Sequence, residues 1–240
     1  MRNDQRQLDQ VRPLVLETHF LKDPPGSVLV SLGATRVLCT ATVDERVPPH
    51  RLASGGGWLS AEYAMLPGST RERRKRDREH VDGRSVEIQR LIGRSLRAAI
   101  DLDRIGPRTI WIDCDVLQAD GSTRCAAITG GSVALVLALR QLARRGLVLP
   151  PEKLLRTQVA AVSVGIVDGE VAVDLCQDED NRAEVDMNVV ATASGQLIEI
   201  QGTAEGKAFP RDQAGQMIDR ALAAIEALVV QQQRAIEISA

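Results

Sequence analysis

The chain has 240 residues, of which 44% are hydrophobic and 26% are charged, and its formal net charge is −2. This length and composition are typical of a soluble globular protein that buries a core in one large domain or two small ones. Aromatic residues make up only 2%, which excludes a nucleic-acid site built mainly on aromatic stacking, and the small net charge excludes a uniformly basic surface.

The amino terminus, MRNDQRQLDQVRP, is polar and has no hydrophobic signal region. No apolar run approaches the roughly 20 residues of a membrane span. Cys39, Cys114, Cys125 and Cys176 form no CxxC pair, and the scattered histidines stand at no zinc-site spacing from them. We therefore expect reduced thiols, no structural zinc, no membrane partner and a cytoplasmic location.

The first predicted element is a β-hairpin over residues 26–43, where alternating apolar residues flank a turn at Gly33-Ala34. A loop rich in proline and glycine then leads to a short apolar strand, AEYAML. The three glycines at 55–57 lack the strand-to-helix setting of a phosphate loop, which favours a flexible loop. Residues 71–80, RERRKRDREH, carry six basic and three acidic residues. Taken alone, this arm is predicted to be a solvated surface segment.

Two helices and a strand are predicted in the middle of the chain. The first helix spans residues 85–100, with Ser85 as its cap and Glu87 near its positive end. Its apolar face consists of Val86, Ile88, Leu91, Ile92, Leu96 and Ile100. Residues 108–120 alternate as a strand. A second helix is expected over about residues 125–145, ended by the glycine that follows.

The carboxyl half repeats this order. Hairpins are predicted with turns at Asp168-Gly169 and Ser194-Gly195, and residues 211–232 are predicted to form an amphipathic helix. The apolar stripe of that helix consists of Met217, Ala221, Ala224, Ile225 and Leu228. Strand pairs followed by helices, twice over, indicate an α+β fold with helices covering a mixed sheet. We expect residues 1–240 to form a single domain, with LPPEK at 149–153 as the only candidate seam.

An arginine stands at the start of each central helix, Arg84 just before the first and Arg124 at the mouth of the second. Helix amino termini offer unpaired N–H groups and partial positive charge, and guanidinium groups bind phosphate oxygens in pairs. If the two helices pack side by side, both arginines and the hydroxyls of Ser122 and Thr123 converge on one oxyanion. Ordinary helix capping by the two hydroxyls is an equal alternative, and no lysine follows the glycine turn as in a Walker A loop.

The stretch CQDEDNRAEVDMN contains a second cluster, with five carboxylates at Asp178, Glu179, Asp180, Glu184 and Asp186. Hard cations such as Mg²⁺ or Mn²⁺ prefer oxygen ligands, although the spacing is not that of an EF-hand. We expect Asp178 and Glu179 to lie in a solvated turn. Asp180 and Asp186 are the metal candidates, because Asp186 begins an apolar strand. Phosphate-binding arginines, carboxylates and a basic arm together indicate phosphoryl transfer on a nucleic acid; no GxSxG or Rossmann motif is present.

The chain resembles bacterial ribonuclease PH in a series of motifs that follow in order along nearly its whole length. They are GSVLVS, TRVLCTA, AEYAMLP, EIQRLIGRSLRAA, RTIWIDCDVLQADGSTR, AAITG, AEVDMNVV and IEIQGTAEG. That family is similar to the catalytic halves of polynucleotide phosphorylase and to exosome ring subunits. The resemblance implies a ribonuclease PH-like α+β fold and a phosphate-dependent 3′-to-5′ exoribonuclease that trims tRNA precursors. It also implies release of nucleoside diphosphates, nucleotide addition as the reverse reaction, and a hexameric ring of three dimers.

The resemblance assigns roles to individual residues. Phosphate binding falls on Arg84, Ser122, Thr123 and Arg124, and the acidic pair beside Mg²⁺ or Mn²⁺ falls on Asp180 and Asp186. Contact with RNA is favoured for residues 71–78, through Arg71, Arg73, Arg74 and Arg76. The sequence departs from the family pattern at three positions: Ser122 replaces a glycine and restricts positive φ, Gly68 replaces an arginine, and Asn181 replaces a serine. None of these changes removes a charged group from the expected centre.

These roles suggest a mechanism. Arg84, Thr123 and Arg124 would hold the attacking phosphate in line with the last internucleotide bond, and Asp180 or Asp186 would supply a proton to the departing 3′ oxygen. Recognition through backbone charge predicts little sequence preference and strong salt dependence. The alternatives are a non-catalytic RNA-binding ring subunit of an exosome-like assembly and a hydrolytic nuclease.

Overall fold

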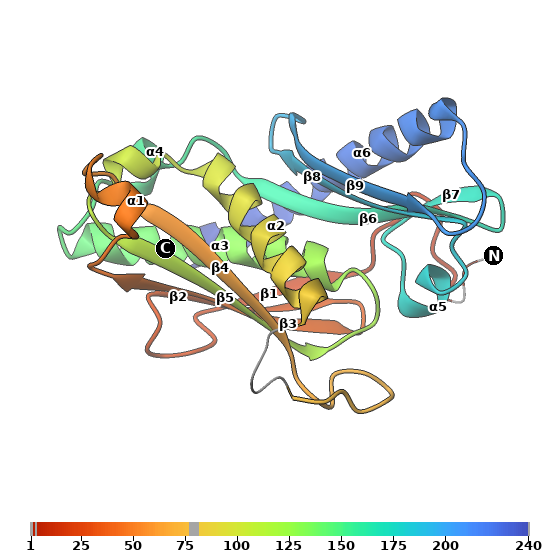
Figure 1. Cartoon of the computed structure of the whole chain (residues 1–240), viewed down its shortest axis with the longest axis horizontal. Helices are drawn as coiled ribbons and strands as arrows, with labels where there is room; N and C mark the ends of the chain where they lie inside the picture. The colour runs from red at the N-terminus through yellow and green to blue at the C-terminus, as the bar shows by residue number, and fades with distance from the viewer. Residues whose placement is uncertain (1, 3, 77–81, 240) are drawn as a thin grey trace.

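In the computed structural model, which describes residues 2, 4–76 and 82–239, the strands divide over two sheets (Figure 1). The first sheet has the order β1 (Leu14–Thr18), β2 (Gly26–Leu32), β3 (Thr35–Asp44), β5 (Thr109–Gln118), β4 (Trp58–Met65). The second has the order β7 (Glu170–Val173), β6 (Val159–Val167), β8 (Val185–Thr192), β9 (Leu197–Ala204). Strand β4 runs parallel to β5, and the other pairs are antiparallel. The expected α+β class with a mixed sheet is confirmed, and the second sheet is a further feature.

Two helices lie between the sheets and a third covers the second sheet. Helices α2 (Gly83–Ala99) and α3 (Thr123–Arg144) contact each other; α3 packs on β2, β3 and β6, and α2 packs on β4 and β9. Helix α6 (Arg211–Ile238) packs on β6, β7 and β8. The short helical segments are α1 (Pro49–Leu52), η1 (Leu102–Arg104), α4 (Pro151–Leu154) and α5 (Gln177–Asp180).

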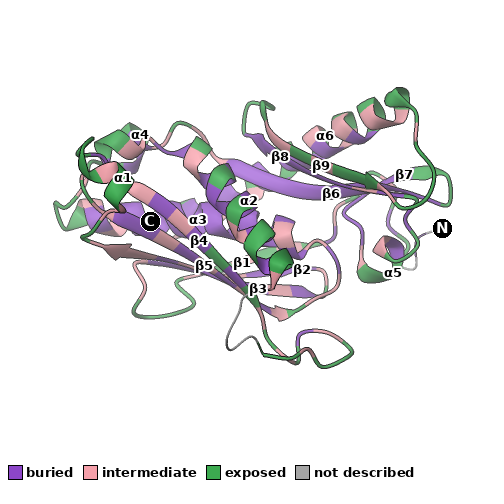
Figure 2. Ribbon diagram, in the orientation of Figure 1, coloured by how far each residue is buried: buried purple, intermediate pink, exposed green. Residues whose placement is uncertain are grey.

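Strand β6 joins the two halves of the core. Every residue of β6 is buried (Figure 2), which explains why its sequence is apolar except for Ser163, since a strand covered on both faces needs no polar alternation. Val159 and Ala161 belong to the core that contains α2, α3 and the first sheet. Ala160 and Val162 belong to the core beneath α6. We propose on this basis that the two sheets act as one structural domain.

Most of the predicted elements are found where the sequence placed them. The turns at Gly33-Ala34, Asp168-Gly169 and Ser194-Gly195 each join two antiparallel strands. Helix α3 matches its expected range to within two residues, and Gly146 follows it in a left-handed conformation with φ +71°. The apolar stripe predicted for α6 is buried, from Met217 to Leu228.

Three local expectations are wrong. The amino-terminal cap of α2 is Asp82, whose carboxylate accepts the backbone N–H of Ser85 at 2.7 Å, so Ser85 is not the cap. Val86 faces solvent, because that helix buries a narrower face than expected. Helix α6 continues six residues beyond Gln232, since Ile236 reaches the first core.

Helix α3 also corrects the expectation about apolar runs. It is the one helix among the described residues that is long and apolar enough to cross a membrane, judged by length and composition. However, 89% of its apolar window is buried inside the protein, which is the arrangement of a core helix in a folded domain.

Candidate functional site

The residues predicted to bind phosphate and metal line one cavity of about 100 Å³. They are Arg84, Ser122, Thr123, Arg124, Asp180 and Asp186. The contributing elements are the first turns of α2 and α3, the end of α5 and the start of β8. The volume equals about three water molecules at ~30 Å³ each, which is room for one small oxyanion. Two cationic side chains at helix starts and two carboxylates therefore line one space of about phosphate size.

The turn before α3 depends on two residues with positive φ. Gly121 has φ +73°, and a side chain there would collide with the carbonyl oxygen of Leu175. Ser122 has φ +54°, a conformation that costs energy for any residue with a Cβ. Its hydroxyl makes no capping bond to α3; it donates to Asp174 Oδ1 at 2.8 Å and lies 2.7 Å from Ser163 Oγ. Helix capping is therefore wrong for Ser122, and its hydroxyl is engaged inside the protein.

Tyr63, which the sequence did not predict as a site residue, orients the hydroxyl of Thr123. The Tyr63 hydroxyl donates to Thr123 Oγ1 at 2.9 Å, which leaves the threonine hydroxyl proton to donate to a ligand. Burial raises the pKa of Tyr63, so it stays a neutral donor. Tyr63 is the only tyrosine of the chain and occupies a buried position of β4, which is the signal that could have identified it.

The two arginines of the site differ in their surroundings. Arg84 lies exposed in the first turn of α2. Arg124 is half-buried and donates to Gln201 Oε1 at 3.1 Å and to Glu87 Oε1 at 3.3 Å. Glu87 lies beyond the first turn of α2, so its observed partner is this guanidinium rather than the helix end. An anion at Arg124 would compete with the Glu87 carboxylate.

The two aspartates are held in an unfavourable electrostatic environment. Burial raises the pKa of Asp180, although the positive charges of Arg84 and Arg124 oppose this shift. Burial, together with the negative charge of Asp180, raises the pKa of Asp186 to about 6. Repulsion between two nearby carboxylates disfavours double ionisation unless a cation lies between them. No group of three or more potential metal-ligating side chains is present in the described part of the chain.

The acidic turn and the basic arm differ from each other in burial. Asp178 is exposed, as expected, but Glu179 is only 2% exposed and forms an ion pair with Arg2, so its assignment to a solvated turn is wrong. In the arm, Arg71, Arg73 and Arg76 are exposed, whereas Arg74 lines the cavity and pairs with Asp82 at 3.3 Å. The predicted contact at positions 77 and 78 lies outside the described residues.

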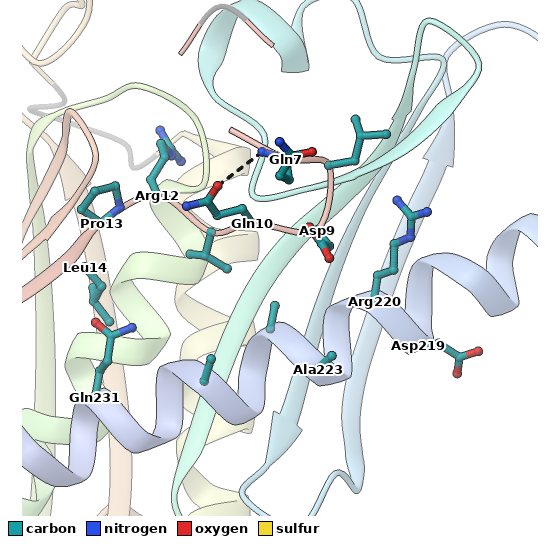
Figure 3. Close-up of a pocket in the computed structure, with 14 residues that line it drawn as sticks. Gln7, Asp9, Gln10, Arg12, Pro13, Leu14, Asp219, Arg220, Ala223 and Gln231 are labelled. Carbon is teal, nitrogen blue, oxygen red and sulfur yellow. Dashed lines mark hydrogen bonds between the residues drawn. The ribbon is translucent and has the colours of Figure 1, made fainter. Parts of the chain in front are cut away.

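A larger cavity, of about 1080 Å³, lies elsewhere (Figure 3). It is bounded by residues 7–14 and by one side of α6, where Ala223, Ala224 and Ala227 form part of the wall. It contains neither the cationic helix tips nor the aspartate pair. Because charge complementarity to a phosphate requires those groups, the smaller cavity is the candidate site.

Comparisons with known proteins show the family to which the chain belongs. Residues 10–141 match the model of the 3′ exoribonuclease family, domain 1, and residues 157–224 match that of domain 2. The chain is 58% identical over 229 residues to a protein named ribonuclease PH from Synechococcus sp. (strain JA-3-3Ab), covering 95% of each chain. It is 56% identical over 238 residues to ribonuclease PH from Mycolicibacterium smegmatis, covering 98% of this chain and 92% of that protein.

Solved structures share the fold at low sequence identity. Rice Rrp46 has a TM-score of 0.79 at 20% identity, covering 98% of this chain and all of the other. The Archaeoglobus fulgidus exosome with RNA bound to its active site has the same TM-score and identity, covering 96% of this chain and 92% of the matched chain. At this level of identity the likeness establishes the architecture.

Proposed function

Because this chain belongs to the 3′ exoribonuclease family, and is a phosphate-dependent 3′-to-5′ exoribonuclease that acts on tRNA precursors, we propose that its small cavity binds the attacking phosphate. An oxygen of inorganic phosphate attacks the last internucleotide phosphorus, the bond to the 3′ oxygen breaks, and a nucleoside diphosphate leaves. The convergence of Arg84 and Arg124 with Asp180 and Asp186 supports this assignment.

Phosphate binding is the role of the two helix tips. Arg84 and Arg124 neutralise the repulsion between two anions, which is the main obstacle when phosphate attacks a phosphodiester. The Thr123 hydroxyl donates to the same anion, with its acceptor side already occupied by Tyr63. Ser122 contributes its backbone alone, because its hydroxyl is bonded to Asp174.

Asp180 and Asp186 would hold Mg²⁺ or Mn²⁺. The fit rests on two half-buried carboxyls that line one cavity, where the negative charge of Asp180 raises the pKa of Asp186. A cation relieves such repulsion, and Mg²⁺ commonly takes one or two carboxylates with the remaining ligands from water and substrate. When bound, the cation supplies stabilisation of negative charge on the scissile phosphate. One of the two carboxyls would deliver a proton to the departing 3′ oxygen.

The direct test is a reaction of a short RNA with Mg²⁺, in the presence and absence of phosphate, with identification of the products. We expect nucleoside diphosphates that form only when phosphate is present. Monophosphates formed without phosphate would indicate a hydrolytic nuclease. RNA binding without either product would indicate a non-catalytic subunit of an exosome-like assembly.

Glu87 limits phosphate affinity, because its carboxylate occupies Arg124 at 3.3 Å. We predict that Glu87→Gln lowers KM for phosphate by up to about fivefold, since an exposed ion pair contributes about 0.2–1 kcal/mol. Initial rates at varied phosphate measure this effect. The control is Glu226→Gln, which replaces an exposed glutamate of α6. A Glu87→Gln variant with an unchanged or higher KM for phosphate would contradict the prediction.

The basic arm is proposed to bind the RNA backbone. Replacing Arg73 and Arg76 together by glutamine should weaken RNA binding and reduce the slope of log affinity against log salt by about 1.4, at roughly 0.7 per lost single-strand contact. Binding of short RNAs measured at several salt concentrations tests this. The matched control replaces Arg144 and Arg145, which are exposed at the other end of α3. Equal slopes for the two double variants would contradict the proposal that the basic arm binds RNA.

We further propose a cytoplasmic enzyme that assembles as a hexameric ring of three dimers. The likeness to chains of archaeal exosomes supports ring assembly, because those chains share the fold of this chain over more than nine-tenths of their length. Light scattering of the purified protein tests the proposal. A mass six times that of the chain is expected, and a monomer at micromolar concentration would contradict it.

A further inference from the structure

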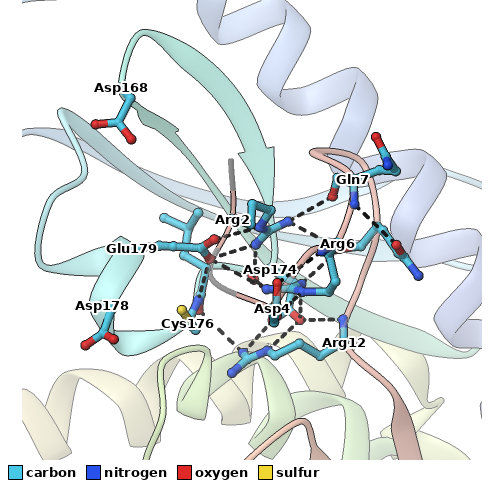
Figure 4. A network of polar contacts seen from close by, with 12 residues as sticks. Arg2, Asp4, Arg6, Gln7, Arg12, Asp168, Asp174, Cys176, Asp178 and Glu179 are labelled. Atoms are coloured by element: carbon cyan, nitrogen blue, oxygen red, sulfur yellow. Dashed lines mark hydrogen bonds and ion pairs between the residues drawn. The ribbon is translucent and has the colours of Figure 1, made fainter.

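A network of buried charges, drawn in Figure 4, contacts the candidate site through the bond between Asp174 and Ser122. We call it the arginine network; it consists of Arg2, Arg6, Arg12, Asp174 and Glu179. All five side chains are buried, and Asp174 is 0% exposed. Charged side chains are rarely buried so deeply unless they are paired. None of the five is among the described residues that line the small cavity, so any effect on a bound ligand must pass through other groups.

The network has two arms. The first, Arg12 with Asp174, contacts the phosphate loop, which consists of Ser122, Thr123 and Arg124. Asp174 Oδ1 accepts from Arg12 Nη2 at 2.7 Å and from Ser122 Oγ at 2.8 Å, and its Oδ2 accepts from Arg12 Nε at 2.8 Å. Burial alone would raise the pKa of Asp174, but the bonds from Arg12 and Ser122 keep it below its ordinary value. A permanent carboxylate therefore holds Ser122, the residue whose left-handed backbone begins α3.

The second arm leads to the helix that carries Asp180. Glu179 accepts from Arg2 Nε at 2.6 Å and from Arg2 Nη2 at 2.7 Å, and it also accepts the backbone N–H of Cys176 at 3.0 Å. Helix α5 has only four residues, far below the length at which an isolated helix is stable. Its position is therefore set by contacts such as those of Glu179.

The two arms are joined within the amino-terminal segment. Arg2 Nη2 also donates to the backbone oxygen of Asp174 at 2.9 Å. Arg12 Nη1 donates to the backbone oxygen of Asp120, whose carboxylate in turn accepts the N–H of Gln177, the first residue of α5. The same short segment thus contacts both the turn before α3 and the turn that carries Asp180.

We propose that the arginine network is a positioning device that fixes the phosphate loop at Ser122 and the acidic helix at Asp180 relative to each other. This inference rests on the proposed function. The five residues are positioning residues, because they act through Ser122 and Asp180 rather than on the substrate. Such control matters because a displacement of about 1 Å at a reacting centre costs about 100-fold in rate.

The test separates the two arms by kinetics. Arg12→Gln should raise KM for phosphate about tenfold or more while RNA affinity stays within about twofold, because it loosens the phosphate loop. Arg2→Gln should lower kcat by a similar factor with less effect on KM for phosphate, because it loosens α5. Arg46→Gln, an exchange in an exposed surface pair, is the matched control and should leave both constants unchanged.

A double-mutant cycle distinguishes positioning from general loss of stability. Ser122→Ala removes the bond to Asp174, so Arg12→Gln should add little to KM for phosphate in that background. Additive effects would overturn the proposal, as would a folded Arg12→Gln variant with unchanged KM for phosphate. If Arg12→Gln does not fold, Ser122→Ala alone decides, because its KM for phosphate must rise while its thermal unfolding remains cooperative.

These outcomes remain distinct from a failure of the proposed function. The wild-type protein must form nucleoside diphosphates only with phosphate present, and Arg84→Ala must weaken phosphate use, before the network is tested. If those two results fail, the site assignment is wrong. If they hold and the cycle shows no coupling, only the positioning role is wrong.

Discussion

Replacing Arg124 by alanine is expected to lower kcat/KM for phosphate by about 100- to 1000-fold, the range found when one preorganised donor is removed from an active site. Arg124 is the half-buried cation in the first turn of α3, and it lines the same cavity as the acidic pair. Without it, phosphate must approach a second anion with only Arg84 to offset the repulsion. Rates at varied phosphate with a fixed RNA concentration measure the loss.

Two further variants sharpen this result. Arg124→Lys keeps the charge but loses the planar fork, so it should recover only part of the activity. Arg90→Ala removes an exposed arginine from α2 and should have no effect on phosphate use. Equal loss in the Arg90 and Arg124 variants would show that overall charge, rather than the helix-tip site, is responsible.

Replacing Asp186 by asparagine is expected to have the second large effect on activity. We expect kcat to fall by about 100- to 10,000-fold with RNA binding retained, because both cation binding and proton delivery depend on the aspartate pair. Single-turnover rates and RNA binding should be measured on the same preparation. An Asp186→Asn protein with undiminished turnover would refute the metal and proton roles together.

The raised pKa of Asp186 allows its role in cation binding to be tested in the wild-type protein by varying the pH. Burial and Asp180 raise this pKa to about 6, so the carboxyl is increasingly protonated as the pH falls through 6. If the ionised form holds the cation, the rate should decrease over that range, and a higher Mg²⁺ concentration should move the decrease to lower pH, because protons and metal compete. A pH profile that does not respond to Mg²⁺ would argue against metal binding by this residue.

The raised pKa also has a consequence for stability, with a defined sign. The folded protein binds a proton at Asp186 up to a pH of about 6, whereas the unfolded chain releases it near 3.8. The folded state therefore loses stability as the pH rises from about 4 to about 6, and above that range it carries a buried charge. In metal-free buffer at pH 7, Asp186→Asn should melt at a higher temperature than wild type, with a difference that shrinks toward pH 4.

Part of the candidate site follows from local sequence features, and part depends on contacts between distant residues. Arg84, Thr123 and Arg124 could be placed in advance, because helix starts and the glycine turn before α3 are local features. Tyr63 and Glu87 could not be assigned their partners, since those contacts join elements 60 and 37 residues apart in the chain. The direction of the Ser122 hydroxyl likewise depends on Asp174, which lies 52 residues further on.

The sequence by itself determined the hairpins, the central helices and the order of the charged motifs, because side-chain periodicity depends on residues two to four positions apart. Only the tertiary structure decided that the strands form two sheets, that β6 is shared by both cores, and that Glu179 is buried rather than solvated. The pairing of Arg2 with Glu179 spans 177 residues. A charge is stable in the interior only when its partner is brought there, and that partner is chosen by the packing of the whole chain.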